Sequence, residues 1–174
     1  MTRWLAILPI LALLGLGLIG TQNLLREEKP TTSLADNRLA PVRTFPALFE
    51  AGPDLVFNPP PGNRPIIVNL FASWCAPCEV EHPLLLELAD THDGQLYGIL
   101  YKDAPENGRA FLSRLGNPFT AAGIDENGQG GLDFGLTGVP ETFVIDGTGR
   151  VLLHVRGPLT PDRLAEIREL VDAS

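Results

Sequence analysis

Two cysteines, Cys75 and Cys78, are the only ones in this chain of 174 residues, and Ala76 and Pro77 separate them. A C-x-x-C pair can close one short disulfide and open it again, which is the chemistry of thiol–disulfide exchange. Two cysteines cannot build a disulfide-rich scaffold, and they cannot fill a four-cysteine zinc site. The pair is therefore the first candidate for chemistry in this sequence.

Three other interpretations of the pair are open. A structural disulfide across so short a loop would constrain little of the unfolded chain, so it would stabilise weakly. A metal site could use Cys75, Cys78 and His82, but a structural zinc site needs a fourth ligand, and the sequence offers none nearby. The pair could also be two inert buried thiols. Redox catalysis is favoured because of the elements that flank the pair.

A strand is predicted before the cysteines and a helix after them. Residues 66–72 are β-branched and apolar on both faces, which is typical of a buried central strand. Residues 73–78 form a turn, and residues 79–90 continue as a helix with leucines on one side. Pro83 lies inside this helix, where we expect a kink.

This placement gives the two thiols different tasks. Cys75 lies at a helix N-terminus, where unpaired N–H groups and the helix dipole stabilise an anion. We therefore predict that Cys75 is the thiolate nucleophile. Cys78 lies one turn later and more covered, so we predict that it resolves a mixed disulfide. Pro77 stiffens the ring between them.

The rest of the chain continues the alternation of strands and helices, which predicts an α/β fold with a mixed central sheet. A proline-rich loop region at residues 45–65 precedes these elements. A hairpin is predicted where Asp146 and Gly147 connect two apolar runs. The predicted elements are a strand at 95–101, a helix at 106–115, a short strand at 119–122, repeated glycine-rich turns at 128–138, hairpin strands at 142–145 and 151–155, and a helix that Thr160 caps.

The chain opens on an apolar segment. The seventeen residues Trp4–Gly20 carry no charged side chain, and as a helix they would span roughly 25 Å at about 1.5 Å per residue. Residues 18–21 make a poor cleavage site, so an uncleaved signal anchor is favoured over a cleavable signal peptide. We predict a transmembrane helix at residues 1–25, a tether at 26–44 and one domain at 45–174. The flanking basic residues do not decide the orientation.

The charge balance excludes one class of partner. The chain has 13 basic and 21 acidic residues, a net charge of −8. A nucleic-acid-binding protein normally presents a basic face, so we expect no nucleic acid as a partner. The glycine run at residues 128–131 matches no phosphate-binding motif.

Several motifs resemble one family. Residues 71–78 (Phe-Ala-Ser-Trp-Cys-Ala-Pro-Cys) and 138–142 (Gly-Val-Pro-Glu-Thr) resemble the thioredoxin superfamily, the second as its cis-proline loop. The separation of 65 residues from Cys75 to Pro140 is longer than in a plain thioredoxin, which implies an inserted helix–strand unit. Further segments resemble the cytochrome c maturation thiol:disulfide interchange proteins, the DsbE/CcmG family. These segments are residues 69–71, 81–83, 101–103, 115–118 and 131–133, together with the cis-proline loop.

The resemblance implies a thioredoxin-like fold and a periplasmic reductase that uses no cofactor beyond its dithiol and no metal. The dithiol would reduce a disulfide in apocytochrome c or in another maturation protein, so that haem can attach to free thiols. A membrane thiol transporter would then reduce Cys75–Cys78 again. The anchor would cross the bacterial inner membrane once, with the domain in the periplasm. A general exported thioredoxin-like reductase or peroxidase, and a non-catalytic membrane-held haem or metal carrier, are the alternatives.

The same resemblance implies a role for two acidic residues near the cysteine pair. Asn69 stands where ordinary thioredoxins bury an aspartate, and a neutral amide cannot accept the proton of the resolving thiol. The family has acids near the site, and Glu81 and Glu141 match them. A carboxylate near a thiol disfavours the thiolate, and it can tune the reduction potential or carry the proton. The alternative is that both are solvated surface acids.

The remaining candidates surround the pair. Pro140 is inferred to be cis from its motif, which would leave the backbone of Val139 free to pair with an extended substrate. Trp74 is expected to pack beside the site. Glu79 departs from the family, where a basic residue commonly follows the second cysteine, and its charge would raise the thiol pKa values. His154 is expected to be peripheral.

Overall fold

The computed structural model describes residues 32–34, 38–57, 60, 64–91 and 96–173. The predicted anchor at residues 1–25 lies outside these residues. Within the described ranges, no helix is both long and apolar enough to span a bilayer.

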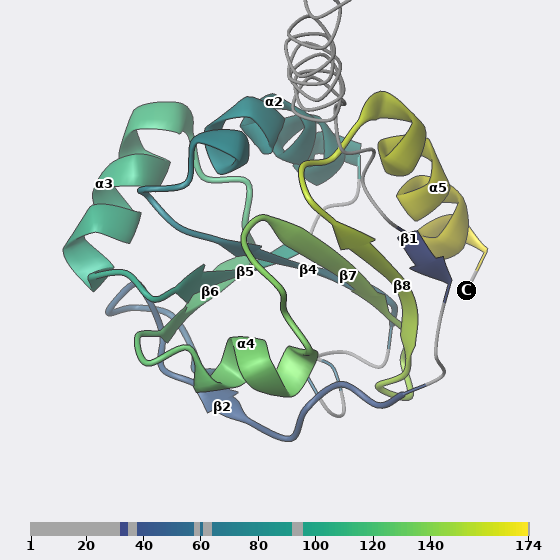
Figure 1. Cartoon of the computed structure of the whole chain (residues 1–174), viewed down its shortest axis with the longest axis horizontal. Helices are drawn as coiled ribbons and strands as arrows, with labels where there is room; N and C mark the ends of the chain where they lie inside the picture. The colour runs from purple at the N-terminus through teal and green to yellow at the C-terminus, as the bar shows by residue number, and fades with distance from the viewer. Residues whose placement is uncertain (1–31, 35–37, 58–59, 61–63, 92–95, 174) are drawn as a thin grey trace, which may run out of the picture.

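A six-stranded mixed sheet forms the centre of the molecule, in the order β1-β8-β7-β4-β5-β6 (Figure 1). The central strand β4 runs parallel to β5 and antiparallel to β7. All six residues of β4 are buried, as its β-branched, two-sided apolar pattern predicts. The strands of this sheet are β1 (Thr32–Leu34), β4 (Ile66–Phe71), β5 (Leu96–Tyr101), β6 (Ala121–Asp125), β7 (Glu141–Ile145) and β8 (Val151–Arg156). A second, two-stranded sheet pairs β2 (Thr44–Phe45) with β3 (Leu55–Val56).

Helices cover the two faces of the sheet unequally (Figure 1). On one face lie α2 (Ala76–Thr91), α3 (Pro105–Leu115) and α5 (Pro161–Asp172), and their apolar residues share one core cluster with Cys75 and Cys78. On the other face lies α4 (Gln129–Phe134), whose Phe134 joins a second cluster. The sheet therefore separates an α2 face from an α4 face.

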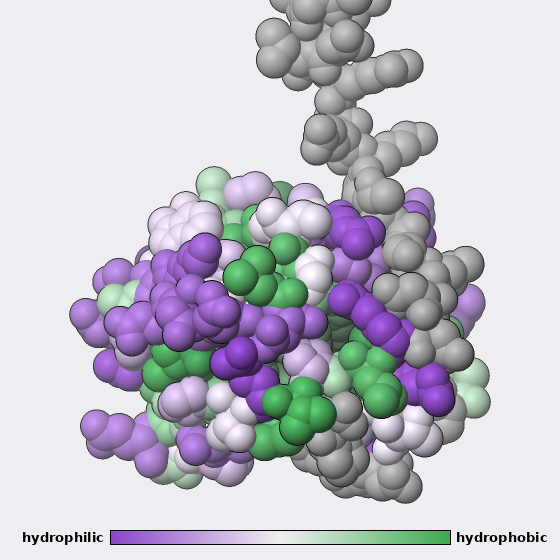
Figure 2. Space-filling view, turned by 60° about the horizontal axis from the view of Figure 1, so that its bottom comes forward, coloured by the Kyte–Doolittle hydropathy of each residue, from purple (hydrophilic) through white to green (hydrophobic). Residues whose placement is uncertain are grey.

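The surface on the α4 side mixes polar and apolar groups, and the apolar side chains lie in separate small patches (Figure 2). Scattered exposed apolar residues are normal for a folded domain. Large apolar side chains that are exposed among the described residues are Leu39, Val42, Trp74, Val80 and Leu132.

The predicted strand at residues 66–72, the hairpin and the Thr160 cap are confirmed. The Oγ1 of Thr160 accepts a hydrogen bond from the Arg163 N–H at 3.4 Å, and Pro161 opens α5. The short strand predicted at 119–122 is displaced, since β6 begins at Ala121.

The prediction of repeated turns at residues 128–138 is wrong, because α4 occupies the first part of that segment. The carboxylate of Asp125 accepts the N–H groups of Gly130 and Gly131 at 3.0 and 2.7 Å, which satisfies free donors at the start of the helix. A Cβ at Gly130 would lie 2.2 Å from the ring of Phe45. Close packing therefore requires glycine at this position. Because glycine has a low helix propensity, the sequence does not predict the helix.

Candidate active site

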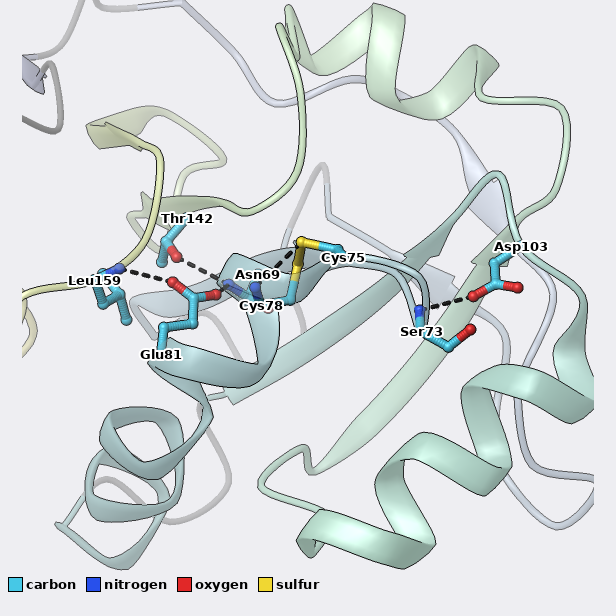
Figure 3. Close-up of a disulfide and its surroundings, with 8 residues drawn as sticks. All are labelled: Asn69, Ser73, Cys75, Cys78, Glu81, Asp103, Thr142 and Leu159. Atoms are coloured by element: carbon cyan, nitrogen blue, oxygen red, sulfur yellow. Dashed lines mark hydrogen bonds between the residues drawn. A yellow bond between two sulfur atoms is a disulfide. The ribbon is translucent and has the colours of Figure 1, made fainter. Parts of the chain in front are cut away.

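The two cysteines form a disulfide at the N-terminus of α2 (Figure 3). Cys75 immediately precedes Ala76, the first residue of the helix. Its Sγ accepts a hydrogen bond from the Cys78 N–H at 3.1 Å, as an N-cap side chain does. Cys75 is 4% exposed and Cys78 is 1% exposed, so Cys78 is the more covered sulfur residue. The Cys75 sulfur thus lies at the N-terminus of α2, where the N–H groups of the first turn have no partner within the helix.

The loop after β5 braces the loop that carries the disulfide. The carboxylate of Asp103 accepts the Ser73 N–H at 2.7 Å (Figure 3), and the Trp74 indole N–H donates to the Lys102 carbonyl at 3.2 Å. The indole ring itself is exposed. Sequence reasoning did not select Asp103. Its position between β5 and a helix that opens on Pro105 does not make it a cap, because the N-cap of α3 is Ala104, which makes no side-chain capping hydrogen bond.

Glu81 is almost fully buried, which excludes a solvated surface acid at this position. Its Oε1 accepts the Asn69 amide N–H at 2.8 Å, and its Oε2 accepts the Leu159 N–H at 2.7 Å (Figure 3). Burial raises the pKa of Glu81 to about 7, although both hydrogen bonds act in the opposite direction. A carboxyl that titrates near neutral pH therefore lies one helical turn after Cys78.

Asn69 connects this acid to the neighbouring strand. Its amide N–H also donates to the Thr142 Oγ1 at 3.0 Å, and Asn69 pairs with Thr142 in the β4–β7 register. The buried Oδ1 of Asn69 has no hydrogen-bond partner among the described residues. The sequence did not single out Thr142 or Leu159, because both belong to the site only through the tertiary fold.

Pro140 follows a cis peptide bond to Val139, as its motif predicts. Val139 is half-buried and packs against the core cluster that contains both cysteines. The Pro140 carbonyl accepts the Gly157 N–H at 3.0 Å. In the structure the cis-proline loop comprises residues 137–140, because Glu141 and Thr142 of the motif already belong to β7 (Glu141–Ile145). The loop is thus attached to the β8–α5 connection.

Glu141 is also buried, but it lies on the α4 face of the sheet. It pairs with Leu70 in the β4–β7 register, and Leu70 belongs to the core cluster of the α4 face. Its neighbour Thr142 points to the opposite face, where it contacts Asn69. Glu81 and Glu141 therefore do not share one acidic cluster at the disulfide.

His154 is the partner of Glu141, with the His154 Nε2 and the Glu141 Oε2 separated by 2.6 Å. His154 is buried and stacks on the Phe143 ring at 4.1 Å. The expectation that His154 is peripheral is wrong with respect to burial, because the alternation of β8 turns this side chain into the core.

Glu79 is neutralised by a cation. Its carboxylate receives two hydrogen bonds from Arg114 at 2.8 and 3.2 Å. The bonds and the charge of Arg114 lower the pKa of Glu79. The expected influence of Glu79 on the thiols is therefore opposed by a guanidinium that the sequence does not place beside it.

His82 does not point at a metal site. Its Nε2 lies 2.9 Å from the Gly116 carbonyl oxygen, and its ring meets Phe111 edge-on. Burial lowers the pKa of His82. The described residues contain no group of three or more His, Cys, Asp and Glu side chains able to hold a metal ion.

Comparisons with known proteins agree with this geometry. Residues 60–171 match the Redoxin family. The chain is 50% identical over 97 residues to the thiol:disulfide interchange protein HelX of Rhodobacter capsulatus, which covers 55% of this chain and 54% of that protein. It is 38% identical over 133 residues to the thiol:disulfide interchange protein DsbE of Pasteurella multocida, covering 75% and 70% of the two chains. The first of these matches spans only about half the length of the relative.

Solved structures support the fold. A thiol:disulfide interchange protein of the thioredoxin family from Chlorobium tepidum superposes with a TM-score of 0.63 at 22% identity, covering 80% of this chain and 99% of that one. The predicted thioredoxin-like α/β fold with a mixed central sheet is therefore confirmed.

Proposed function

Since the chain belongs to the Redoxin family and, within it, to the DsbE group of thiol:disulfide interchange proteins, we propose that it is a thiol:disulfide oxidoreductase acting as a reductase in cytochrome c assembly. The observation that carries this proposal is the disulfide at the start of α2, where the Cys78 N–H donates to the Cys75 sulfur. The same donor, with the other free N–H groups of the first turn, would stabilise a Cys75 thiolate after reduction.

The reaction is a pair of thiol–disulfide exchanges. The Cys75 thiolate attacks a substrate disulfide, so that a mixed disulfide forms and one substrate sulfur leaves as a thiolate, which takes up a proton. Cys78 then attacks the Cys75 sulfur, the second substrate sulfur leaves, and the Cys75–Cys78 disulfide closes. Two electrons pass to the substrate, and a dithiol donor returns them by the reverse steps.

Cys78 must lose its proton before it can attack, and Glu81 is the proposed acceptor. It lies one turn after Cys78 on α2, it is buried, and its pKa is about 7. A base whose pKa is near the operating pH transfers protons efficiently in both directions. Asn69 would hold this acid in place through its amide N–H.

The proposed substrate is the disulfide of apocytochrome c or of a maturation partner, and the proposed electron donor is a membrane thiol transporter. The relatives are named thiol:disulfide interchange proteins, which supports the exchange reaction. The two partners are what the resemblance to the cytochrome c maturation family implies. We also propose the organisation argued from the sequence: an anchor at residues 1–25 in the bacterial inner membrane, a tether within 26–44 and a periplasmic domain at 45–174. Part of the range 26–44 belongs to the domain as well, because Thr32–Leu34 form β1, which pairs with β8 in the central sheet. The inserted helix–strand unit would lie among α3, β6 and α4, between β5 and β7.

A trapping experiment tests the order of the two cysteines. Cys78→Ser should accumulate a mixed disulfide with a peptide that carries the C-x-x-C-H haem-attachment motif in oxidised form, because no resolving thiol remains. Mass spectrometry would detect the adduct, and Cys75→Ser is the matched control, expected to capture none. If both variants capture the peptide equally, or neither does, the proposed roles are wrong.

The reduction potential tests the direction of electron flow. The reduction potential of a reductant should be well below the potentials of strong periplasmic oxidants, which are about −120 mV. Titration against glutathione would measure it, and a value near that of the oxidants would contradict the reductase assignment. Turnover of hydrogen peroxide without a protein partner would instead favour the peroxidase. Stoichiometric haem or metal binding with both thiols alkylated would favour the carrier.

A further inference from the structure

A second buried polar cluster lies beneath the cis-proline loop, on the face of the sheet away from α2. Glu141 and His154 are 1% and 3% exposed, and they lie among the apolar residues of the α4-face core. The proposed exchange chemistry uses neither residue. Burying a carboxylate is costly unless it is well hydrogen-bonded, so this pair calls for a structural or functional reason.

The two oxygens of the Glu141 carboxylate bind different parts of the protein. Oε1 accepts the Thr137 N–H at 3.0 Å, and the Thr137 hydroxyl donates to the same oxygen. Oε2 binds the His154 Nε2 at 2.6 Å. One oxygen therefore holds the start of the loop and the other holds strand β8. The three residues between Thr137 and Glu141 are Gly138, Val139 and Pro140.

His154 is itself firmly placed. Its ring stacks on Phe143 at 4.1 Å, and Phe143 packs against Phe134 of α4 with ring centroids 5.0 Å apart. The far end of the loop is fixed separately, because the Pro140 carbonyl accepts the Gly157 N–H at 3.0 Å. The start of the loop is thus linked through Glu141 to His154 of β8, and its end is bound to Gly157, the residue that follows β8.

We propose that Glu141 and His154 act as a strut that preorganises residues 137–139 for an incoming substrate backbone, and not as charges that tune the thiols. Their role in substrate binding rests on the proposed function, since it requires a partner that pairs with Val139. When the loop is already ordered, substrate binding does not include the entropy cost of ordering it. The strut therefore strengthens substrate binding. Glu141 and His154 are positioning residues, because neither contacts the sulfur atoms.

The position of the carboxylate supports a strut over a tuning charge. Glu141 points to the α4 face, whereas both cysteines belong to the core of the α2 face. Three donors already bind its two oxygens. Burial alone would raise the pKa of Glu141, but the hydrogen bonds from His154 and Thr137 lower it below its usual value. The carboxylate is therefore engaged in the loop rather than available to a thiol.

Comparing removal with conservative replacement tests the proposal. Glu141→Ala and His154→Leu should each raise the KM for an oxidised C-x-x-C-H peptide about tenfold, the loss expected for a well-placed hydrogen bond. Glu141→Gln should largely restore the KM, because its amide oxygen still accepts from Thr137 and its NH₂ group can donate to the other tautomer of His154. His154→Gln should also leave the KM near the wild-type value, because its side chain keeps an N–H donor for the Glu141 carboxylate. The reduction potential should stay at the wild-type value in all four variants.

Amide hydrogen exchange gives a readout that needs no activity. Exchange of the Thr137 amide of the oxidised protein, which donates to the Glu141 Oε1, should accelerate about tenfold in Glu141→Ala and His154→Leu and remain slow in the two glutamine variants. Thr137→Val, a mild change at an exposed residue, should accelerate it less. Glu106→Ala, which removes an exposed acid of α3, is the control for loss of charge.

The outcomes separate the two ideas. A reduction potential that shifts equally in Glu141→Ala and Glu141→Gln, with unchanged KM, would overturn the strut and favour charge tuning. Unchanged exchange in Glu141→Ala and His154→Leu would overturn it as well, and faster exchange without a change in KM would overturn its role in substrate binding. If the wild-type protein does not reduce the peptide, the proposed function fails, while the exchange data still decide whether the strut holds the loop.

Discussion

At the residue scale, two buried glutamates of this protein have opposite electrostatic environments. Glu81 receives one backbone and one amide N–H, and burial raises its pKa to about 7. Glu141 is equally buried, but hydrogen bonds from His154 and Thr137 outweigh burial and lower its pKa. These environments suit the two proposed roles, proton exchange for Glu81 and support of the loop for Glu141.

Glu81 should make the stability of the oxidised domain depend on pH. Its pKa is about 7 in the folded protein against an ordinary glutamate pKa of 4.5, so the folded state binds the proton more tightly than the unfolded state. Stability should therefore fall as the pH rises from about 4.5 to about 7, by about 3 kcal/mol at 1.36 kcal/mol per pKa unit. Chemical unfolding across this range would measure the change.

Glu81→Gln should remove this part of the pH dependence, because the amide does not titrate. Its oxygen can still accept from Leu159, and the free Oδ1 of Asn69 can turn toward its NH₂ group. Glu87→Gln, at an exposed position of the same helix, is the matched control and should keep the wild-type profile. A variant profile that coincides with the wild type would show that Glu81 does not titrate in this range.

At the element scale, the active-site turn depends on the neighbouring loop. Asp103 follows β5 and accepts the N–H groups of Ser73 and Ala104 at 2.7 and 2.8 Å and the Asn107 amide at 3.1 Å. Burial would raise the pKa of Asp103, but these hydrogen bonds lower it. One side chain thus joins the turn after β4 to the start of α3.

Asp103→Ala should destabilise the domain by about 1–3 kcal/mol, because it leaves part-buried N–H donors without an acceptor. Urea unfolding at neutral pH would measure the loss. Asp133→Ala is a matched control, because the ion pair that Asp133 forms with Arg43 is exposed and contributes at most about 1 kcal/mol. Equal losses in the two variants would contradict a bracing role for Asp103.

At the scale of the whole molecule, the sheet separates two buried polar groups of residues. The α2 face carries the disulfide, Glu81 and the larger share of the helices. The α4 face carries the Glu141–His154 pair under the cis-proline loop. The surface on the α4 side is polar with scattered apolar patches (Figure 2), and the chain has a net charge of −8.

This negative charge should steer basic partners toward the protein. Oxidised C-x-x-C-H peptides with lysine flanks should react faster at low ionic strength than at high ionic strength, by about tenfold, because salt screens long-range attraction. Stopped-flow measurement of the second-order rate constant would test this. Peptides with glutamate flanks are the control and should show the opposite trend. The same salt dependence for both peptides would exclude steering by net charge.

Local sequence determined the position of the reactive pair. The apolar run of β4, the turn and the helix after it are patterns of neighbouring residues, so they locate Cys75 at a helix N-terminus without knowledge of the rest of the fold. The Thr160 cap is local for the same reason, whereas the cis bond before Pro140 was inferred from the resemblance of its motif to a family. The helix α4 escaped prediction, because its glycines are chosen for contact with Phe45 and Tyr101 rather than for helix propensity.

The sequence by itself thus determined the fold class, the two thiols and their place at a helix start. Only the tertiary structure decided what surrounds them: Glu81 meets the backbone of Leu159, 78 residues later, and Glu141 meets His154 on the opposite face. The physical reason is that periodicity fixes which way a side chain points within its own element. Desolvation and hydrogen bonding depend on elements that are distant in sequence and meet only when the sheet is assembled.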